Sequence, residues 1–171
     1  MTKYVAFLRG VNVGGVNLKM AEVADVLTEA GFTNVRTVLA SGNVLLESSA
    51  EVTSVRKKAE AALRDRFRYE AWVLAYDIDT VRAIDEAFPF ERERDGYQSY
   101  VTFVTDADIL DELAALSPGA KERIQAGEGV IYWQVPKGGT LDSTIGVTMG
   151  KKRYKSSTTS RNLRTLAKVL K

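Results

Sequence analysis

The stretch RGVNVGG, residues 9–15, has residue types and a position suited to binding a charged ligand. It lies between an apolar run and a segment of helical periodicity that begins near Lys19. A loop that leads into a helix presents unpaired backbone N–H groups, and the helix dipole there favours an anion. Residues 1–21 contain no acidic side chain that would repel a phosphate. We therefore expect an anion site made by Arg9, Gly10, Asn12, Gly14, Gly15 and Lys19.

A second interpretation of this loop is purely structural. Its spacing is not G-x-G-x-x-G, and it lacks the G-K-[ST] ending of a P-loop. Glycines also suit a long surface loop whose backbone requires positive φ angles. The sequence leaves both interpretations open.

The C-terminal region is the other candidate for binding. From Ser143 to Lys171 it holds eight Lys and Arg and no acidic residue, whereas the other 142 residues carry 16 basic and 22 acidic groups. This uneven distribution of charge predicts an anionic partner for the C-terminal segment, or docking of that segment on the acidic remainder of the chain. Basic residues around one aromatic ring suit nucleic acid or another anion. The candidate contacts are Lys151, Lys152, Arg153, Tyr154, Lys155 and Arg161.

Two further motifs are better explained as structure. Ser41, Gly42 and Asn43 are typical of a tight hairpin turn, and we expect this turn at the end of the sheet opposite the first loop. Asp77 and Asp79 could hold a magnesium ion, but helix capping by Asp79 accounts for them more simply.

The composition limits the chemistry. The chain has no His and no Cys, which excludes a Ser-His-Asp triad, a thiolate nucleophile and the usual zinc sites. We predict no metal and no cofactor, and any enzyme reaction would have to use Asp, Glu, Lys, Tyr, Ser or Thr. No apolar run approaches the ~20 residues of a membrane span, and the start does not resemble a signal peptide. We expect a cytoplasmic protein that does not interact with membranes.

The hydrophobic pattern of the first half predicts the elements that position these residues. Strands are expected at 3–8, 35–39, 44–47 and 71–76, and helices from Met20 to about Ala30 and from Val52 to Phe67. The order strand, helix, strand, strand, helix, strand indicates a ferredoxin-like unit. It predicts strand order 4-1-3-2, strand 3–8 in a central position, and both helices on one face. A short helix at 81–88 completes a first subdomain over residues 1–88.

The pattern then restarts after a charged linker at 89–97. Strands are expected at 100–104, 121–126 and 130–135, with a helix at 109–116. Leu163, Leu166, Ala167 and Leu170 predict a final helix, capped by Thr159 or Ser160, that leaves Arg164 and Lys168 in water. Residues 98–171 thus form a second, less regular subdomain, and the fold class is α+β with two ferredoxin-like (βαββαβ) subdomains, antiparallel sheets and a C-terminal helix.

Three motifs resemble a known family. The stretches YVAFLRGVNVGG…LKM, VRTVLASGNVLLES and TTSRNLRTLAKVL together look like the bacterial family filed as domain of unknown function 1697. The resemblance covers nearly the whole chain and implies two ferredoxin-like halves with no established activity. The chain departs from the family pattern at Val16, at Leu163 with the inserted Ser160, and in the stretch KGGTLDSTIG.

The leading functional hypothesis is therefore binding of a phosphate-bearing small molecule or nucleotide by the loop at 9–15. The first alternative is nucleic-acid binding by the basic tail, against which the third strand, VLLE, lacks the stacking aromatics of an RNA-recognition sheet. The second is an enzyme whose reaction the residues do not identify. The oligomeric state is left open.

Overall fold

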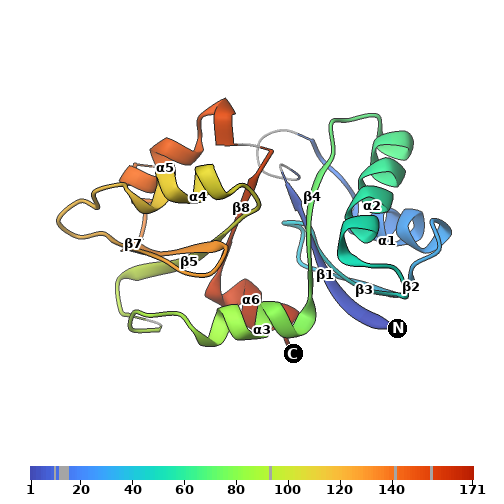
Figure 1. The fold of residues 1–171 in the computed structure, drawn as a ribbon, viewed down its shortest axis with the longest axis horizontal. Coiled ribbons are helices and arrows are strands. Elements are labelled where there is room, and N and C mark those ends of the chain that lie inside the picture. Colours follow the sequence, from blue (N-terminus) through green and yellow to red (C-terminus); the bar gives the residue numbers. More distant parts are fainter. Residues whose placement is uncertain (10, 12–15, 93, 141, 155) are drawn as a thin grey trace. The chain divides into compact units, whose positions relative to one another are not determined.

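The computed structural model describes all residues except 10, 12–15, 93, 141 and 155 (Figure 1). The chain divides into two compact units, Met1–Val81 with Lys168–Lys171, and Arg82–Ala167. The division falls inside a helix, upstream of the segment at 89–97 that the sequence suggests as a linker. Each unit holds one four-stranded antiparallel sheet, as the fold class predicts.

The elements of the first unit follow the predicted order. They are β1 (Thr2–Arg9), α1 (Met20–Glu29), β2 (Thr33–Val38), β3 (Asn43–Ser48), α2 (Val52–Phe67) and β4 (Trp72–Asp77), followed by α3 (Ile78–Glu86), which crosses the division. Gly31 adopts a φ of +106° just after α1, a conformation that glycine allows and that ends the helix there.

The sheet of the first unit has the order β2-β3-β1-β4, which confirms the predicted topology and the central position of β1. Alternate residues of β1, including Ala6 and Leu8, share one core with Val23 of α1 and Val55 of α2. Both helices therefore cover the same face of the sheet, as predicted. The intervening residues Val5 and Phe7 are also fully buried, so β1 is apolar on both faces.

The position predicted for the β2–β3 turn is wrong. Phe7 pairs with Asn43, and the Leu8 N–H donates to the Gly42 carbonyl at 2.8 Å. The turn therefore lies at the end of the sheet where β1 finishes and the glycine-rich loop begins. The reason is geometric: a helical crossover makes β2 run in the direction of β1, so both strands end on the same side.

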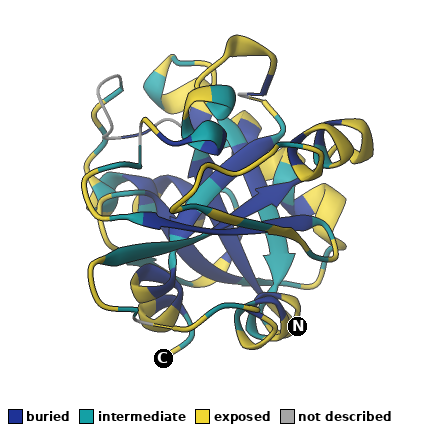
Figure 2. Cartoon of the chain, turned by 90° about the vertical axis from the view of Figure 1, so that its left-hand side faces the viewer, coloured by how far each residue is buried: buried dark blue, intermediate teal, exposed yellow. Residues whose placement is uncertain are grey.

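The second unit repeats this strand order. It contains β5 (Tyr97–Val104), α4 (Ala107–Ala114), β6 (Arg123–Ala126), β7 (Val130–Pro136), α5 (Thr144–Met149), a 3₁₀ turn (Lys152–Tyr154), β8 (Thr158–Asn162) and α6 (Leu163–Val169). The sheet order is β6-β7-β5-β8. Its core packs residues of α4 and α5 against the central strands, among them Leu113, Ile131, Trp133 and Ile145. The central strands β5 and β7 hold buried residues, whereas the edge strand β6 has none. Buried strands lie in the middle of the view in Figure 2, and helices with exposed sides lie around them.

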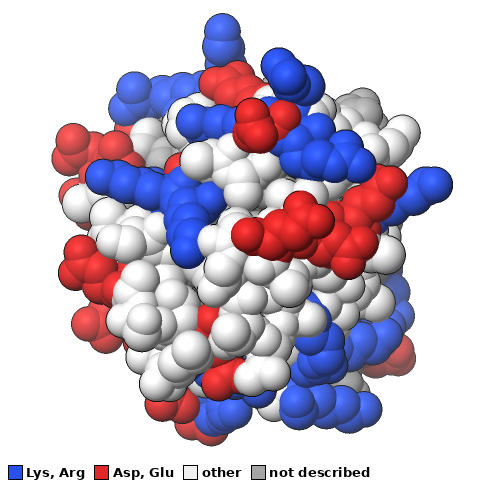
Figure 3. Space-filling model, turned by 90° about the vertical axis from the view of Figure 1, so that its right-hand side faces the viewer, with Lys and Arg blue, Asp and Glu red and all other residues white. Residues whose placement is uncertain are grey.

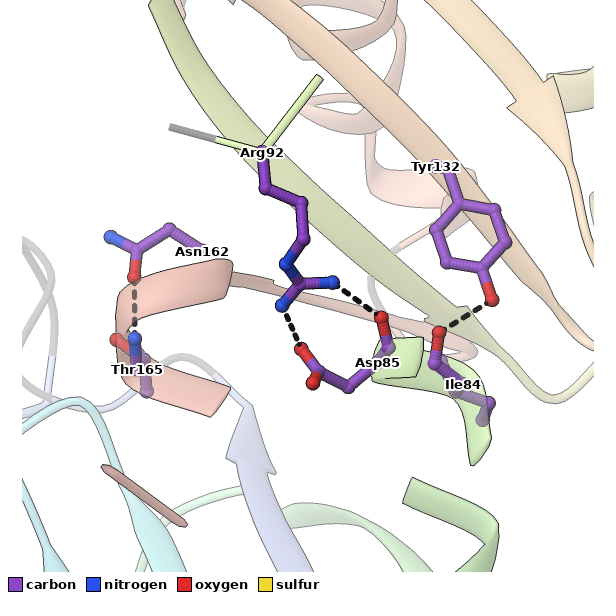
Figure 4. A network of polar contacts seen from close by, with 6 residues as sticks. All are labelled: Ile84, Asp85, Arg92, Tyr132, Asn162 and Thr165. Atoms are coloured by element: carbon purple, nitrogen blue, oxygen red, sulfur yellow. Dashed lines mark hydrogen bonds and ion pairs between the residues drawn. The ribbon is translucent and has the colours of Figure 1, made fainter. Parts of the chain in front are cut away.

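Two helix caps differ from the predictions. Asp77, and not Asp79, accepts a hydrogen bond from the Thr80 N–H, at 2.8 Å, so α3 begins earlier than expected. The Asn162 side chain accepts from the Thr165 N–H at 2.8 Å and caps α6 (Figure 4). Thr159 and Ser160, the predicted caps of that helix, instead lie within β8. An aspartate or asparagine placed three residues before the bonded N–H is the preferred capping arrangement.

Contacts at the end of α3 belong to the second unit. The Arg92 guanidinium donates to both the backbone and the side-chain oxygen of Asp85, at 2.7 and 2.8 Å (Figure 4). The Tyr132 hydroxyl of β7 donates to the Ile84 carbonyl at 2.7 Å. The Arg92 bonds join the end of α3 to the segment that follows it, and the Tyr132 bond ties the end of α3 to the second sheet. Among the helices that the structure describes, none is long and apolar enough to span a membrane.

Candidate anion site

Arg9 is the last residue of β1 and the first residue of the predicted loop site. Its side chain is half-buried, and burial lowers the pKa of the guanidinium from its ordinary value. The Nε atom is buried and has no hydrogen-bond partner among the residues that the structure describes. A buried donor without an acceptor is costly, and more so when it belongs to a charged group. Arg9 thus offers a donor that an anion would satisfy.

The β2–β3 turn packs against this end of β1. Asn43 is fully buried, and its Nδ2 donates to the Val38 carbonyl at 2.8 Å and to the Ser41 hydroxyl at 2.9 Å. A Cβ on Gly42 would lie 2.7 Å from a methyl carbon of Val11. A larger side chain would therefore displace the first described residue beyond Arg9. The turn supports the start of the loop, a relation that the sequence analysis did not expect.

The end of α2 and the start of β4 contribute two residues that the sequence analysis missed. Trp72 is the register partner of Arg9, so the two side chains project from the same face of the sheet. The Arg64 guanidinium lies over the Trp72 ring, 4.9 Å from its centroid. Its Nε and Nη2 both donate to the Ala71 carbonyl, at 3.0 and 2.7 Å. We call Arg9, Arg64 and Trp72 the Arg9 cluster.

The remaining predicted loop residues are less defined. Gly10, Asn12, Gly14 and Gly15 lie outside the described residues. Val11 and Val16 form an isolated parallel bridge, which brings the two ends of the loop together. Lys19 is exposed and precedes α1, and its own side chain makes no hydrogen bond that caps the helix.

These groups are suited to binding. A guanidinium provides directional donors for a phosphate or carboxylate, and an indole provides a flat apolar surface. Among the described residues, no group of three or more Asp and Glu is arranged to hold a metal ion. The Arg9 cluster contains no nucleophile or general base.

The residues predicted for the basic tail have varied surroundings. Lys151 and Lys152 are exposed, and Lys155 lies outside the described residues. The Arg153 Nη2 donates to Glu112 Oε2 at 2.5 Å, and that hydrogen bond raises the pKa of Arg153. The other two members are buried side chains: Tyr154 is 7% exposed and lies in the second core, and Arg161 is 7% exposed within β8.

Arg161 is held by its own strand. Its Nη1 donates to the Thr159 hydroxyl at 2.7 Å and to the Ser160 carbonyl at 2.8 Å. On the face drawn in Figure 3, basic and acidic side chains lie side by side. Exposed residues of both signs also occur on neighbouring helices of the first unit, such as Asp25 of α1 and Lys57 of α2.

The comparisons with known proteins concern family and fold. A family model described as "Protein of unknown function (DUF1697)" matches residues 1–132. The solved structure of the conserved bacterial protein SP0830 from Streptococcus pneumoniae is similar to this chain, with a TM-score of 0.81 and 21% sequence identity. The alignment covers 99% of this chain and 96% of that one, and supports the α+β fold. No curated protein matches the sequence.

Proposed function

We propose that this chain, which belongs to the family of proteins of unknown function DUF1697, binds a phosphate-bearing small molecule or nucleotide at the end of β1. The observation that carries the proposal is the buried Arg9 Nε, which lacks a partner among the described residues. A phosphate oxygen at hydrogen-bond distance would satisfy this donor and offset the cost of burying the charge.

The surroundings of Arg9 support an anion over a cation or a neutral ligand. The Arg64 guanidinium lies over the ring of Trp72, and Trp72 is the register partner of Arg9. Lys19 follows the loop, and the first acidic residue in the sequence is Glu22. The proposal also includes Gly10, Gly14 and Gly15, which lie outside the described residues, because glycines allow a phosphate to approach the main chain closely.

The strength of the Arg9 contact follows from general values. A hydrogen bond to a charged group contributes about 1.5–3 kcal/mol. That free energy corresponds to roughly a tenfold to a hundredfold change in affinity. The Arg9→Ala variant should therefore bind a phosphate ligand that much more weakly, and Arg9→Lys should recover only part, because an ammonium lacks the planar fork of donors.

Calorimetry with a panel of nucleotides and sugar phosphates tests the proposal. The matched control is Arg36→Ala, which removes an exposed arginine from β2 of the same sheet and should leave affinity unchanged. If a phosphate compound binds and Arg9→Ala binds it equally well, Arg9 is not the site. If none of the panel binds the parent protein at millimolar concentration, the proposal is wrong.

A further inference from the structure

We infer that the ligand of the Arg9 site is a nucleotide whose base stacks on Trp72, in preference to a sugar phosphate or inorganic phosphate. This inference rests on the proposed function and narrows its ligand class. The juxtaposition that carries it is the Arg9–Trp72 register pair, in which a guanidinium whose Nε has no partner among the described residues lies beside an indole on the same face of the sheet.

The position of Trp72 leaves its ring within reach of a ligand. β4 is an edge strand of its sheet, and the Trp72 side chain is half-buried, in contrast with the neighbouring Val73, which is 1% exposed. Directly paired residues in an antiparallel sheet have Cβ atoms about 5 Å apart. A phosphate on Arg9 would therefore place an attached ribose and base within range of the indole.

Arg64 prepares the ring for stacking. Both of its bonded guanidinium nitrogens are directed to the Ala71 carbonyl, so the group that lies over the indole is itself held in place. An aromatic side chain held in one orientation loses little entropy when a base stacks on it. Stacking of bases on aromatic side chains tolerates any base, so the inference specifies a nucleotide without a preferred base.

The other tryptophan allows a clean spectroscopic test. Trp133 is 2% exposed, stacks on Tyr100 with ring centroids 4.3 Å apart, and donates its indole N–H to Thr102 at 2.8 Å. It lies in the core of the second unit, so a base has no access to it. A ligand that quenches tryptophan fluorescence in the parent protein, but not in Trp72→Phe, therefore contacts Trp72.

The experiment compares adenosine 5′-monophosphate with ribose 5-phosphate, which differ by the base. Calorimetry on the parent protein should show the nucleotide binding about tenfold to a hundredfold more tightly, as expected for one stacked base. Trp72→Leu keeps apolar bulk without an aromatic face, and should bind the nucleotide only as tightly as ribose 5-phosphate. Trp72→Phe should keep most of the preference. Circular dichroism melting curves of the two variants check that both are folded.

The outcomes separate this inference from the proposed function. Equal binding of the two compounds by the parent, or an unchanged preference in Trp72→Leu, overturns the role of Trp72 while leaving an Arg9-dependent phosphate site intact. Binding of both compounds that does not respond to Arg9→Ala overturns the proposed function as well. If neither compound binds the parent protein at millimolar concentration, both the inference and the proposed function are overturned.

Discussion

Glu60 of α2 is a buried carboxylate whose removal should weaken the first unit by a measurable amount. It is 8% exposed, and its Oε2 accepts from the Val73 N–H at 2.9 Å. β4 is an edge strand, so half of its backbone groups point away from the sheet, and Val73 contributes one of these donors. The Glu60 side chain therefore satisfies a buried N–H that none of the described strands pairs.

The loss of stability in each variant depends on whether a hydrogen-bond acceptor for the Val73 N–H remains. Glu60→Ala removes a charged acceptor and leaves the Val73 N–H buried without a partner, which should cost about 1.5–3 kcal/mol. Glu60→Gln keeps a carbonyl oxygen in the same place, so its cost should be about 1 kcal/mol or less. Glu70→Ala removes an exposed carboxylate from the loop before β4 and should change stability by less than about 0.5 kcal/mol.

Urea unfolding, followed by far-ultraviolet circular dichroism, gives the free energy of unfolding of the parent protein and of the three variants. Hydrogen exchange of the Val73 amide adds a local measure, because an N–H that loses its acceptor should exchange faster. The essential result is that the free energy of unfolding increases from Glu60→Ala to Glu60→Gln to the parent protein. If Glu60→Ala is as stable as Glu70→Ala, then water or another group satisfies the Val73 N–H and the reasoning is refuted.

Two further predictions concern the last helix and the buried tyrosines. Leu166 is fully buried, so Leu166→Ala should cost about 2–5 kcal/mol in urea unfolding, whereas Lys168→Ala, on the exposed side, should change stability by less than about 0.5 kcal/mol; equal effects would show that α6 does not pack. Burial raises the pKa of Tyr69 and of Tyr76 to about 12 from the ordinary value of 10.0. In the unfolded chain both hydroxyls lose their protons at a lower pH than in the folded protein. The two tyrosines should therefore not affect stability below pH ~10, and the free energy of unfolding should fall as the pH rises toward 12. Phenolate absorbance during an alkaline titration checks this prediction, and titration of every tyrosine near pH ~10 in the folded protein would contradict it.

Parts of the fold could be predicted because local pattern and tertiary structure agree. The apolar residues of segment 52–67 repeat on one side of a helix, and α2 has those bounds. The strand β8 could not be predicted in this way, because TTSRN contains no apolar residue. Thr158, Thr159 and Arg161 are buried by the elements around them, a condition that their own polarity does not signal.

Only part of the candidate site could be predicted from the sequence. Arg9 and its loop could be singled out from local composition. The neighbourhood of Arg9 and Trp72 depends on the register of β1 against β4, and a shift of one residue would place the indole on the opposite face. The turn at Ser41 likewise could be identified from its residue types, whereas its position beside the loop depends on strand direction.

The central position of β1 has a consequence for how the protein is made. β1 pairs with β3 and β4, both of which leave the ribosome long after it. Synthesis proceeds at about 5–20 residues per second, so this strand, with its buried run from Tyr4 to Leu8, stays without its partners for a time on the order of seconds. During that interval it is an apolar segment with both edges open, a target for chaperones that bind nascent chains. Substitutions that slow the formation of the β2–β3 hairpin would prolong that exposure, and should lower the yield of folded protein even where the finished structure tolerates them.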